Sequence, residues 1–310
     1  MVLSVLSSTQ AAGGVLYAET VLSLYPQLVK MIKEPLSTQV AVRCVVFAVL
    51  AVIIGGVGSL AKAFTGVGGA ATFFGLGAIN LLHVWSSYYA FQKLPSGVAL
   101  TLFYTYPILN ILGAWLFYGE SVGLKAVPFF LLAMVGIYMV ASATGTMKTA
   151  SSDDVKEGLS EEKEFDFKGI LAALGAAATE TAIYLVLYGL RAEKGASMFS
   201  SIHRVYTSSA LLLLPFLGSL IKIPDIKGLS VMGLWNSLLG FTGYSARFAA
   251  IPVVSPVIYS ALSLFGIFAS YIWGWLFGRE TITAKGLVGS GLVGLSIFLM
   301  RQFGGFSVEV

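Results

Sequence analysis

Residues 11–24 read AAGGVLYAETVLSL, and residues 172–185 read AALGAAATETAIYL. The two stretches share Ala, Gly, Thr and Leu at matching places, and each holds one glutamate, Glu19 or Glu180, among apolar neighbours. Two basic residues further on recur at the same offset: Lys33 and Arg43 correspond to Lys194 and Arg204. An ionisable group inside a membrane segment is energetically expensive, and its default role is in a substrate or proton site. The two stretches therefore predict a duplicated membrane unit that carries a functional carboxyl group.

The composition of the chain is that of a membrane protein. Of its 310 residues, 57% are hydrophobic and 11% are charged, and the mean hydropathy is +0.86. Soluble domains carry about 25% charged residues, so we expect a protein that crosses the membrane several times. The net charge of +4 fits loop lysines at a membrane surface, and we expect no nucleic-acid partner. The single cysteine, Cys44, allows no intrachain disulfide. Residues 1–10 lack the basic region of a cleaved signal peptide.

Apolar stretches of about 20 residues, the length of a spanning helix, predict an all-α integral membrane fold with ten transmembrane helices. The predicted domains are a first five-helix repeat at 1–143, a charged linker at 144–168, a second repeat at 169–301 and a C-terminal tail at 302–310. The predicted spans are Ala11–Met31, Thr38–Val57, Gly68–Phe91, Ser96–Tyr118, Gly123–Ala143, Gly169–Leu190, Ser197–Ile221, Leu229–Ala250, Ser255–Phe277 and Thr283–Arg301.

The ends of the two units also repeat. The matching residues are Trp115, Leu116, Phe117, Glu120 and Lys125 in the first unit and Trp275, Leu276, Phe277, Glu280 and Lys285 in the second. Because five spans is an odd number, the two units must enter the membrane with opposite polarity. Inverted repeats of this kind are common in transporters, with the binding site at the repeat interface near the middle of the bilayer.

Two units of five spans, each with a Trp-Leu-Phe…Glu turn followed by a final helix that contains glycine, resemble the EamA-type drug/metabolite transporters. The resemblance extends over nearly the whole chain and implies a transporter with both termini in the cytoplasm. The distribution of lysines and arginines in the predicted loops favours the opposite orientation, with both termini outside, and this bias is small when the charged linker is left out. Residues 13–19, GGVLYAE, also resemble the first helix of the small multidrug resistance proteins. In that family the matching glutamate binds a proton and the drug in alternation.

Glu19 and Glu180 are the candidate coupling residues. In a continuous helix Glu19 would lie about 18 Å from the end at Met31, close to the middle of the membrane, and Glu180 holds the equivalent place. Removal from water favours the neutral form of a carboxyl group, so such a group can bind and release a proton near neutral pH. The alternative is a carboxylic acid that stays protonated and hydrogen-bonds a neighbouring helix.

Three arginines inside the predicted spans have more than one interpretation. Arg43 and Arg204 lie near one membrane interface, where an arginine side chain can extend to the headgroups. They could instead pair with the two glutamates or bind an anion. Arg247 lies close to the end of its predicted span, which favours extension to the headgroups over a role as a charge partner.

Further polar and aromatic side chains could line a cavity between the spans. His83 could relay protons or bond a backbone carbonyl. Pro107 should bend the fourth span where polar groups face protein or a cavity, and for single aromatic residues packing or an interfacial place is the alternative. The candidates are Asn80, His83 and Tyr88 in the third span, Tyr104, Tyr106 and Asn110 in the fourth, Asn236 and Tyr244 in the eighth, and Tyr259 in the ninth.

Glycines in the fifth and tenth spans, among them Gly136 and Gly289, allow close helix packing. They could pack the bundle or form a dimer contact, so that a monomer and a homodimer both stay open.

We therefore predict a secondary-active transporter that moves a small organic solute by alternating access, with protons as the coupling ion. The solute could be a metabolite, an amino acid, or an amphiphilic or cationic drug. The alternative is an exchanger of organic anions, such as sugar phosphates or nucleotide sugars. That exchanger would need lysines and arginines at the cavity centre, where the sequence indicates acidic charges.

Two other classes are disfavoured by the sequence. The spans show neither the filter or charge ring of a channel nor the ligand spacing of a metal centre. We expect no enzymatic activity, no catalytic residue, no metal and no cofactor. The expected partners are the solute, protons and the lipid bilayer.

Overall fold

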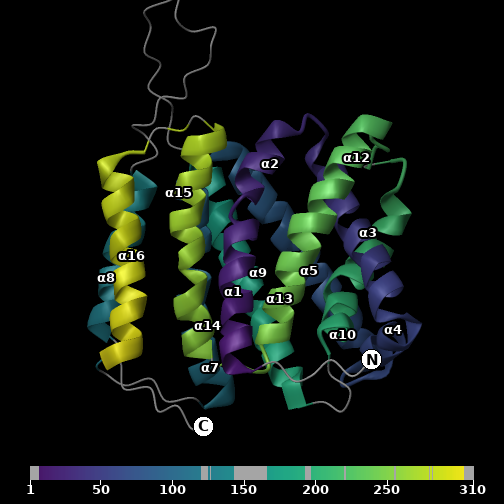
Figure 1. Ribbon diagram of the computed structural model, residues 1–310, viewed down its shortest axis with the longest axis horizontal. Helices are drawn as coiled ribbons and strands as arrows, with labels where there is room; N and C mark the ends of the chain where they lie inside the picture. The colour runs from purple at the N-terminus through teal and green to yellow at the C-terminus, as the bar shows by residue number, and fades with distance from the viewer. Residues whose placement is uncertain are drawn as a thin grey trace, which may run out of the picture.

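The computed structural model describes residues 7–119, 125, 127–142, 166–192, 197–219, 221–254, 256–278, 280 and 282–303. These residues are mostly helical, and the helices run side by side in one bundle (Figure 1). Most of the predicted linker 144–168 and most of the predicted tail 302–310 lie outside the described residues, as does Glu120.

The helices of the first unit are α1 (Ser8–Leu22), α2 (Tyr25–Met31), α3 (Leu36–Gly55), α4 (Val57–Thr65), α5 (Gly69–Lys93), α6 (Ser96–Phe103), α7 (Tyr106–Tyr118) and α8 (Val127–Ser142). Those of the second unit are α9 (Phe167–Gly189), α10 (Met198–Ile202), α11 (Ser208–Leu213), α12 (Ile226–Trp235), α13 (Thr242–Ala250), α14 (Pro256–Ser263), α15 (Phe265–Gly278) and α16 (Ala284–Phe303). The π-helical turn η5 (His203–Thr207) joins α10 to α11, and the π-helical turn η7 (Asn236–Phe241) joins α12 to α13. Short 3-10 turns are η4 (Leu190–Ala192) and η6 (Leu214–Phe216).

Two prolines divide predicted spans into pairs of helices. Pro26 at the start of α2 lacks an N–H, and in a continuous helix its ring would clash with the carbonyl group of Leu22. The predicted span Ala11–Met31 is therefore two helices, and the continuous helix from which the 18 Å distance of Glu19 from Met31 was predicted is interrupted. Pro107 acts in the same way on the fourth span: α6 ends before Tyr104 and α7 begins at Tyr106. The helix is interrupted at the place where the bend at Pro107 was predicted.

A short helix that the sequence analysis did not predict, α4, lies between the second and third predicted spans. Gly56 and Gly68 flank it with φ values of 74° and 75°, a conformation that residues with a Cβ rarely adopt. The axes of α4 and α5 differ in direction by 103°. Glycine therefore makes both turns at which the chain changes direction.

The apolar helices fit a membrane protein, and the number of crossings stays a prediction. Among the described residues, four helical stretches are long and apolar enough to span a bilayer, or up to five if the bent pair α4 and α5 counts as one span. The four are Leu36–Gly55, Ser96–Tyr118, Phe167–Ala192 and Ile258–Gly278.

Helix contacts are related by exchange of the two units. In the first unit α1 packs on α13 and α14 of the second, and in the second unit α9 packs on α5 and α7 of the first. α8 packs on α16, which joins the last helix of one unit to the last helix of the other (Figure 1). This pattern agrees with a two-fold relation between the units. Their opposite orientation in a membrane stays a prediction.

Close approach of α8 to α16 depends on glycine. A Cβ atom at Gly136 would lie 2.6 Å from the carbonyl oxygen of Gly289, and one at Gly289 would lie 2.8 Å from the carbonyl oxygen of Gly136. Of the two roles left open for these glycines, packing within the chain is the one seen.

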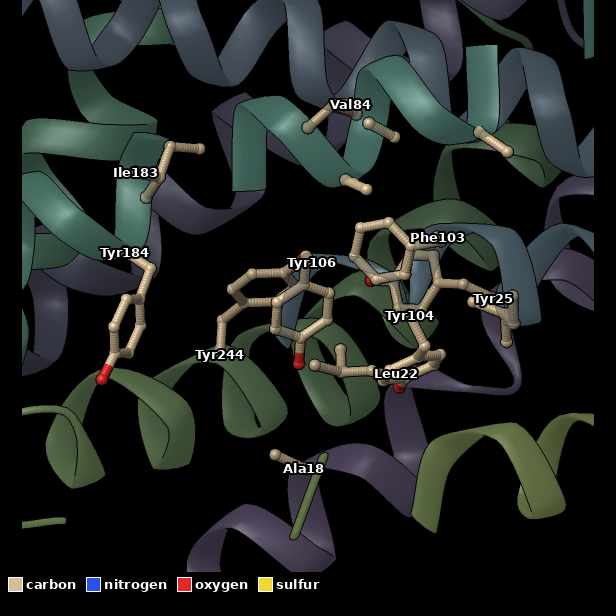
Figure 2. Close-up of a cluster of buried hydrophobic side chains, with 14 of the residues drawn as sticks. Ala18, Leu22, Tyr25, Val84, Phe103, Tyr104, Tyr106, Ile183, Tyr184 and Tyr244 are labelled. Carbon is tan, nitrogen blue, oxygen red and sulfur yellow. The ribbon is translucent and has the colours of Figure 1, made fainter. Parts of the chain in front are cut away.

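The core between the units is rich in aromatic rings. Figure 2 shows Phe103, Tyr104 and Tyr106, at the break between α6 and α7, near Leu22 of α1 and Tyr244 of α13. The ring centroids of Tyr104 and Tyr106 are 5.6 Å apart, and those of Phe103 and Tyr106 are 5.1 Å apart. The Pro107 break thus turns three rings toward the contact between the two units.

Candidate functional site

The centre of the site is an ion pair between the two units. Arg247 of α13 donates from Nε and Nη2 to Oε1 of Glu19 on α1, at 2.9 and 2.7 Å. Nη2 also donates to Oε2 of Glu19 at 2.9 Å. Both side chains are buried, with 1% of Arg247 and none of Glu19 exposed. A bidentate contact between an arginine and a carboxylate is among the strongest hydrogen-bonded contacts between side chains.

The same guanidinium group binds the second glutamate. Nη1 of Arg247 donates to Oε1 of Glu180 at 2.8 Å. One arginine therefore lies between the two duplicated carboxyl groups, and Glu180, on α9, belongs to the same unit as Arg247.

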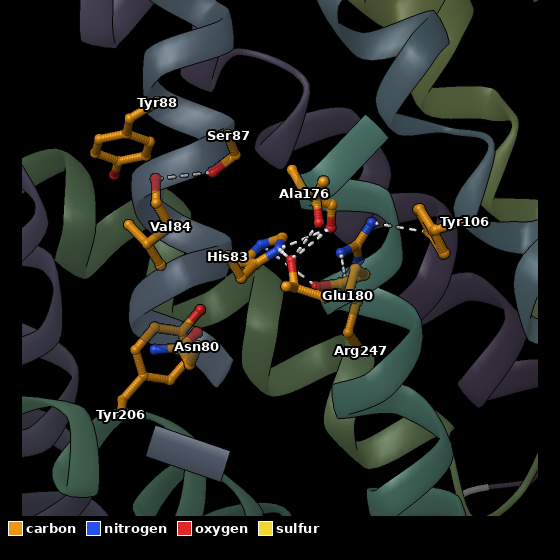
Figure 3. Close-up of polar contacts among 12 residues, drawn as sticks. Asn80, His83, Val84, Ser87, Tyr88, Tyr106, Ala176, Glu180, Tyr206 and Arg247 are labelled. Carbon is orange, nitrogen blue, oxygen red and sulfur yellow. Dashed lines mark hydrogen bonds and ion pairs between the residues drawn. The ribbon is translucent and has the colours of Figure 1, made fainter. Parts of the chain in front are cut away.

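His83 of α5 completes the chain of contacts (Figure 3). Its Nδ1 lies 3.1 Å from the carbonyl oxygen of Ala176, and its Nε2 lies 3.4 Å from Oε2 of Glu180. A carbonyl oxygen only accepts, so Nδ1 carries a hydrogen. The contact of Nε2 with Glu180 is then attractive only when a proton lies on one of the two atoms. The His83–Glu180 contact is therefore a place where one proton can be held.

Two tyrosine hydroxyls from the helix break complete the shell around the glutamates. Tyr104 donates to Oε2 of Glu19 through a short hydrogen bond. The hydroxyl of Tyr106 accepts from Nη2 of Arg247 at 3.1 Å. We call Glu19, His83, Glu180 and Arg247, with these two tyrosines, the central cluster.

A second buried cation, Arg43 of α3, lies among five aromatic rings. We call these rings, of Tyr25, Phe47, Tyr88, Tyr206 and Tyr244, the Arg43 box. Its Nη2 donates to the hydroxyl of Tyr206 at 2.9 Å, and its Nη1 donates to that of Tyr88 at 3.3 Å. The guanidinium carbon lies 4.8 Å from the ring centroids of Tyr25 and Tyr244, within the range of a cation–π contact. Only 3% of Arg43 is exposed, and among the described residues no carboxylate pairs with it.

Arg43 and three members of the central cluster, His83, Tyr104 and Arg247, line one pocket, whereas Glu19, Glu180 and Tyr106 lie behind this lining. The empty space between the lining residues is about 340 Å³, a figure that includes space open to solvent. The polar side of the pocket is formed by Arg43, His83, Ser87, Tyr104 and Arg247. The rest of the lining is apolar or aromatic: Leu22, Tyr25, Phe91, Leu100, Phe103 and Tyr244. A small apolar cavity with a few convergent polar groups is the usual form of a ligand site.

Several predicted site residues lie elsewhere. Asn80 donates to Ser209 across the contact of α5 with α11, and Asn236 donates to the carbonyl oxygen of Met232. Arg204, which corresponds to Arg43, donates from Nε to the carbonyl oxygen of Ala63. None of these three lines the pocket.

Two other predicted residues are buried outside the pocket lining. Tyr259 packs against Tyr184, with ring centroids 5.1 Å apart. Asn110 is fully buried, and within the described part of the chain its amide nitrogen and oxygen have no hydrogen-bond partner. We have no physical account of this unpaired amide.

Two expectations from the sequence are wrong. Extension of Arg247 to the headgroups is excluded, because the side chain is buried and held by Glu19 and Glu180. For Arg43 and Arg204 burial also excludes such extension. The centre is not purely acidic either, since Arg43 and Arg247 line the same pocket.

Sequence reasoning missed two tyrosines that define the Arg43 box. Tyr25 contacts Arg43 with its ring and donates its hydroxyl proton to Oδ1 of Asn236 at 2.8 Å. Tyr206 lies in the π-helical turn η5 and accepts from Arg43. The only local signals were the proximity of Tyr25 to Pro26 and the position of Tyr206 next to polar residues.

No group of three or more His, Cys, Asp or Glu side chains among the described residues could hold a metal ion. The site is thus composed of two arginines, two carboxyl groups, one histidine and phenol hydroxyls. These groups can bind a charged solute and hold a proton.

Comparisons with known proteins agree with the helical architecture. Residues 11–142 match the model of the EamA-like transporter family, and no curated protein matches the chain. Among solved structures 27 chains match. One, described only as "Crystal structure of protein", is 12% identical with a TM-score of 0.59 and covers 95% of this chain and 98% of its own. At that identity the likeness shows the fold alone. The family match agrees with the resemblance over residues 11–142, within the first predicted unit, and with the apolar helices it shows an integral multi-pass membrane protein.

Proposed function

We propose that this protein is an EamA-type transporter, a proton-coupled secondary transporter that moves a small organic solute by alternating access. The observation that carries the proposal is the central cluster, in which groups that can hold a proton join the two units beside the pocket. Ten spans in two inverted units are part of the proposal, supported by the exchange relation among the helix contacts.

Two contacts between ionisable side chains connect the units in the cluster, in addition to the hydrogen bond from Arg247 to Tyr106. Glu19 of the first unit is held by Arg247 of the second, and His83 of the first contacts Glu180 of the second. Buried ion pairs depend on both partners, and loss of charge on one leaves the other unpaired at a cost of several kcal/mol. Protonation of a carboxyl group therefore changes the strength of the ties between the units.

Because the contacts between the units depend on protonation, proton binding is coupled to the motion of one unit against the other. A rigid-body motion of one repeat against the other, around a fixed site, is the usual form of alternating access. Such a motion must break contacts between the units and form new ones. A proton that neutralises Glu19 weakens its tie to Arg247, whereas a proton shared by His83 and Glu180 strengthens that second tie. The solute that occupies the pocket supplies replacement contacts. Proton and solute thus bias the same equilibrium between two states.

The first experiment identifies a solute. Purified protein is screened against metabolites by thermal shift at two pH values, and the compounds that stabilise it are tested for uptake into proteoliposomes. Transport is then measured with an imposed pH gradient and with no gradient.

The second experiment tests the carboxyl group. Glu19→Gln keeps an acceptor for Arg247 and Tyr104 but cannot lose a proton, so we expect uptake driven by the pH gradient to vanish while the protein stays folded. Glu34→Gln is the matched control, since Glu34 lies in the loop between α2 and α3 and is not part of the cluster. Undiminished gradient-driven uptake in Glu19→Gln would refute the coupling role.

A further inference from the structure

The Arg43 box has the properties of an incomplete ion pair. Arg43 is buried at the pocket wall. Within the described residues its Nε has no hydrogen-bond partner, and no carboxylate pairs with its guanidinium group. By contrast, Arg247, the other arginine of the pocket, is bonded to two carboxylates.

Aromatic rings alone do not replace a counter-ion. A cation–π contact attracts the cation to a ring that carries no net charge, and a buried ion without a partner of opposite charge remains costly. The hydroxyls of Tyr88 and Tyr206 accept from Arg43 and are neutral, so they satisfy hydrogen bonds without cancelling charge. Arg43 therefore depends on negative charge that is not in direct contact with it.

The charge balance of the pocket shows where that negative charge lies. Glu19 and Glu180 are opposed by Arg247 and Arg43, so the four groups sum to zero when His83 is neutral. One proton held between His83 and Glu180 leaves a single positive charge in excess. Of the two arginines that line the pocket, Arg43 is the one that has no carboxylate in contact within the described residues, so the excess positive charge is exposed to the pocket there.

We propose that Arg43 binds the oxyanion group of the transported solute and that each anion moves together with one proton, as electroneutral symport. The inference rests on the proposed function and deepens it by naming the substrate class: an organic monoanion whose oxyanion is a carboxylate or a singly charged phosphate. The anion cancels the charge that the proton adds.

Among the described residues, the groups that interact electrostatically with His83 or Glu180 supply no other charge. Besides Glu19, Arg43 and Arg247, these groups are phenols, which are neutral at physiological pH. They are Tyr206 of η5, Tyr244 of α13 and Tyr259 of α14.

The pocket disfavours a cationic group for a simple reason. An ammonium group needs a carboxylate, and the carboxyl oxygens of Glu19 and Glu180 are already bonded to Arg247, Tyr104 and His83. An oxyanion, however, finds an arginine without a carboxylate. The apolar wall formed by Leu22, Phe91 and Leu100 suits the organic body of the solute.

The test compares probes that share one body and differ in charge. Proteoliposomes are loaded at high pH and given phenylacetate, phenylalanine or phenethylamine outside at low pH, with phenyl phosphate as the second oxyanion. We expect uptake of an anionic probe, driven by the pH gradient and unaffected by an imposed membrane potential of either sign. The two oxyanions distinguish carboxylate from phosphate recognition.

Variants then assign the anion to Arg43. Arg43→Gln should lower uptake of the anion about 10- to 100-fold, the effect of one lost hydrogen-bonded charge. Arg43→Lys keeps the charge without the planar fork and should lose less. Arg204→Gln, the equivalent arginine outside the pocket, should stay within about twofold of the parent. If Arg43→Gln does not fold, the affinity of Arg43→Lys for the anion is measured instead. A lowered affinity supports anion binding by Arg43, and a parental affinity supports a structural role.

Each outcome separates the two proposals. Preference for the cation or the zwitterion, uptake of the anion driven by membrane potential, or parental uptake of the anion by Arg43→Gln would each overturn the inference and leave the transporter proposal intact. The same applies if no anion is carried while another solute shows proton-driven uptake. Failure to transport any solute from the wider screen would contradict the proposed function itself.

Discussion

Arg247 and Glu19 are 228 residues apart in the chain and are joined by three hydrogen bonds, with Nη2 of the arginine 2.7 and 2.9 Å from the two carboxyl oxygens. The pair lies between α1 and α13, which belong to different units. It brings one duplicated glutamate into contact with the cation that also holds the other, Glu180. A single guanidinium group therefore holds both duplicated glutamates.

Removal of that guanidinium group should destabilise the protein strongly. Arg247→Gln leaves two buried carboxylates without their cation, and we expect a loss of about 3–5 kcal/mol in the free energy of unfolding. Glu19→Gln in the Arg247→Gln background should restore part of this loss, because one unpaired charge is removed. Denaturation in mixed detergent micelles measures the free energies for a double-mutant cycle.

The cycle has an internal control. Glu34→Gln shares no hydrogen bond with Arg247, so its effect should add to that of Arg247→Gln within about 0.5 kcal/mol. For Glu19 and Arg247 we expect an interaction energy of about 1–3 kcal/mol. Additive effects for that pair would show that the contact does not stabilise the folded state.

His83→Asn should remove the response to pH and keep the fold. The amide of asparagine can still donate to the carbonyl oxygen of Ala176 in place of Nδ1, so we expect a change in unfolding free energy of about 1 kcal/mol or less. No group then remains to share a proton with Glu180. Uptake measured with opposite pH gradients should become equal, whereas the parent protein transports faster in the gradient that supplies protons from the solute side.

The second histidine is the control for this substitution. His203 contacts the hydroxyls of Thr207 and Ser59 and lies outside the pocket lining. His203→Asn should keep the parental difference between the two gradients. A gradient response that survives in His83→Asn would exclude the His83–Glu180 contact as the proton site.

The repeat in the sequence predicted part of this site and hid another part. Glu19 and Glu180 were recognisable because both copies of the unit carry them. Arg247 was not, since the residue at the equivalent place in the first unit is Ser87. Its position near a helix end suggested the headgroups, because the distance of a residue from a helix end does not reveal which neighbouring helix its side chain meets.

The Arg43 box shows a second limit of sequence reasoning. Arg43 and Arg204 are equivalent in the repeat, yet only Arg43 faces the pocket. Its ring contacts come from α2, α3, α5, η5 and α13. Such a box depends on helix rotation and on the break before Pro26, which brings Tyr25 into place. Periodicity predicts that a segment is helical and leaves its rotation undetermined.

Gly266 of α15 should be sensitive to a single added methyl group. A Cβ atom there would overlap the Tyr104 hydroxyl and lie 3.0 Å from Oε2 of Glu19. We expect Gly266→Ala to displace Tyr104 from Glu19, to destabilise the protein by about 1–3 kcal/mol and to impair transport. Gly291→Ala in α16 is the matched control, since a Cβ atom at Gly291 meets nothing within 4 Å.

In Gly291→Ala only the higher helix propensity of alanine should act, and it should raise the free energy of unfolding by up to about 1 kcal/mol. Thermal unfolding in detergent and uptake into proteoliposomes measure both effects. If the two alanine variants behave alike, the hydroxyl of Tyr104 is not held against Glu19 as tightly as the geometry indicates.

A second polar tie between the units lies away from the central cluster. Oε1 of Glu280, just after α15, accepts from Nζ of Lys30 at 2.6 Å and from the Ser96 hydroxyl at 2.8 Å. Oε2 accepts from the backbone N–H of Ser96 at 2.7 Å, at the first residue of α6. The carboxylate therefore holds the ends of α2 and α6 against the end of α15.

Loss of this carboxylate should make the pocket more accessible, because the contacts that hold α2 and α6 weaken while the central cluster stays intact. The test uses Phe91→Cys, a pocket-lining position that is 5% exposed, with Cys44 replaced by alanine. In this background Glu280→Gln should raise the labelling rate by a membrane-impermeant maleimide about tenfold, the effect of one charge-assisted hydrogen bond. Glu34→Gln should leave that rate unchanged. Equal rates with and without the Glu280 carboxylate would mean that the tie does not control access to the pocket, and that the central cluster alone holds the units in this arrangement.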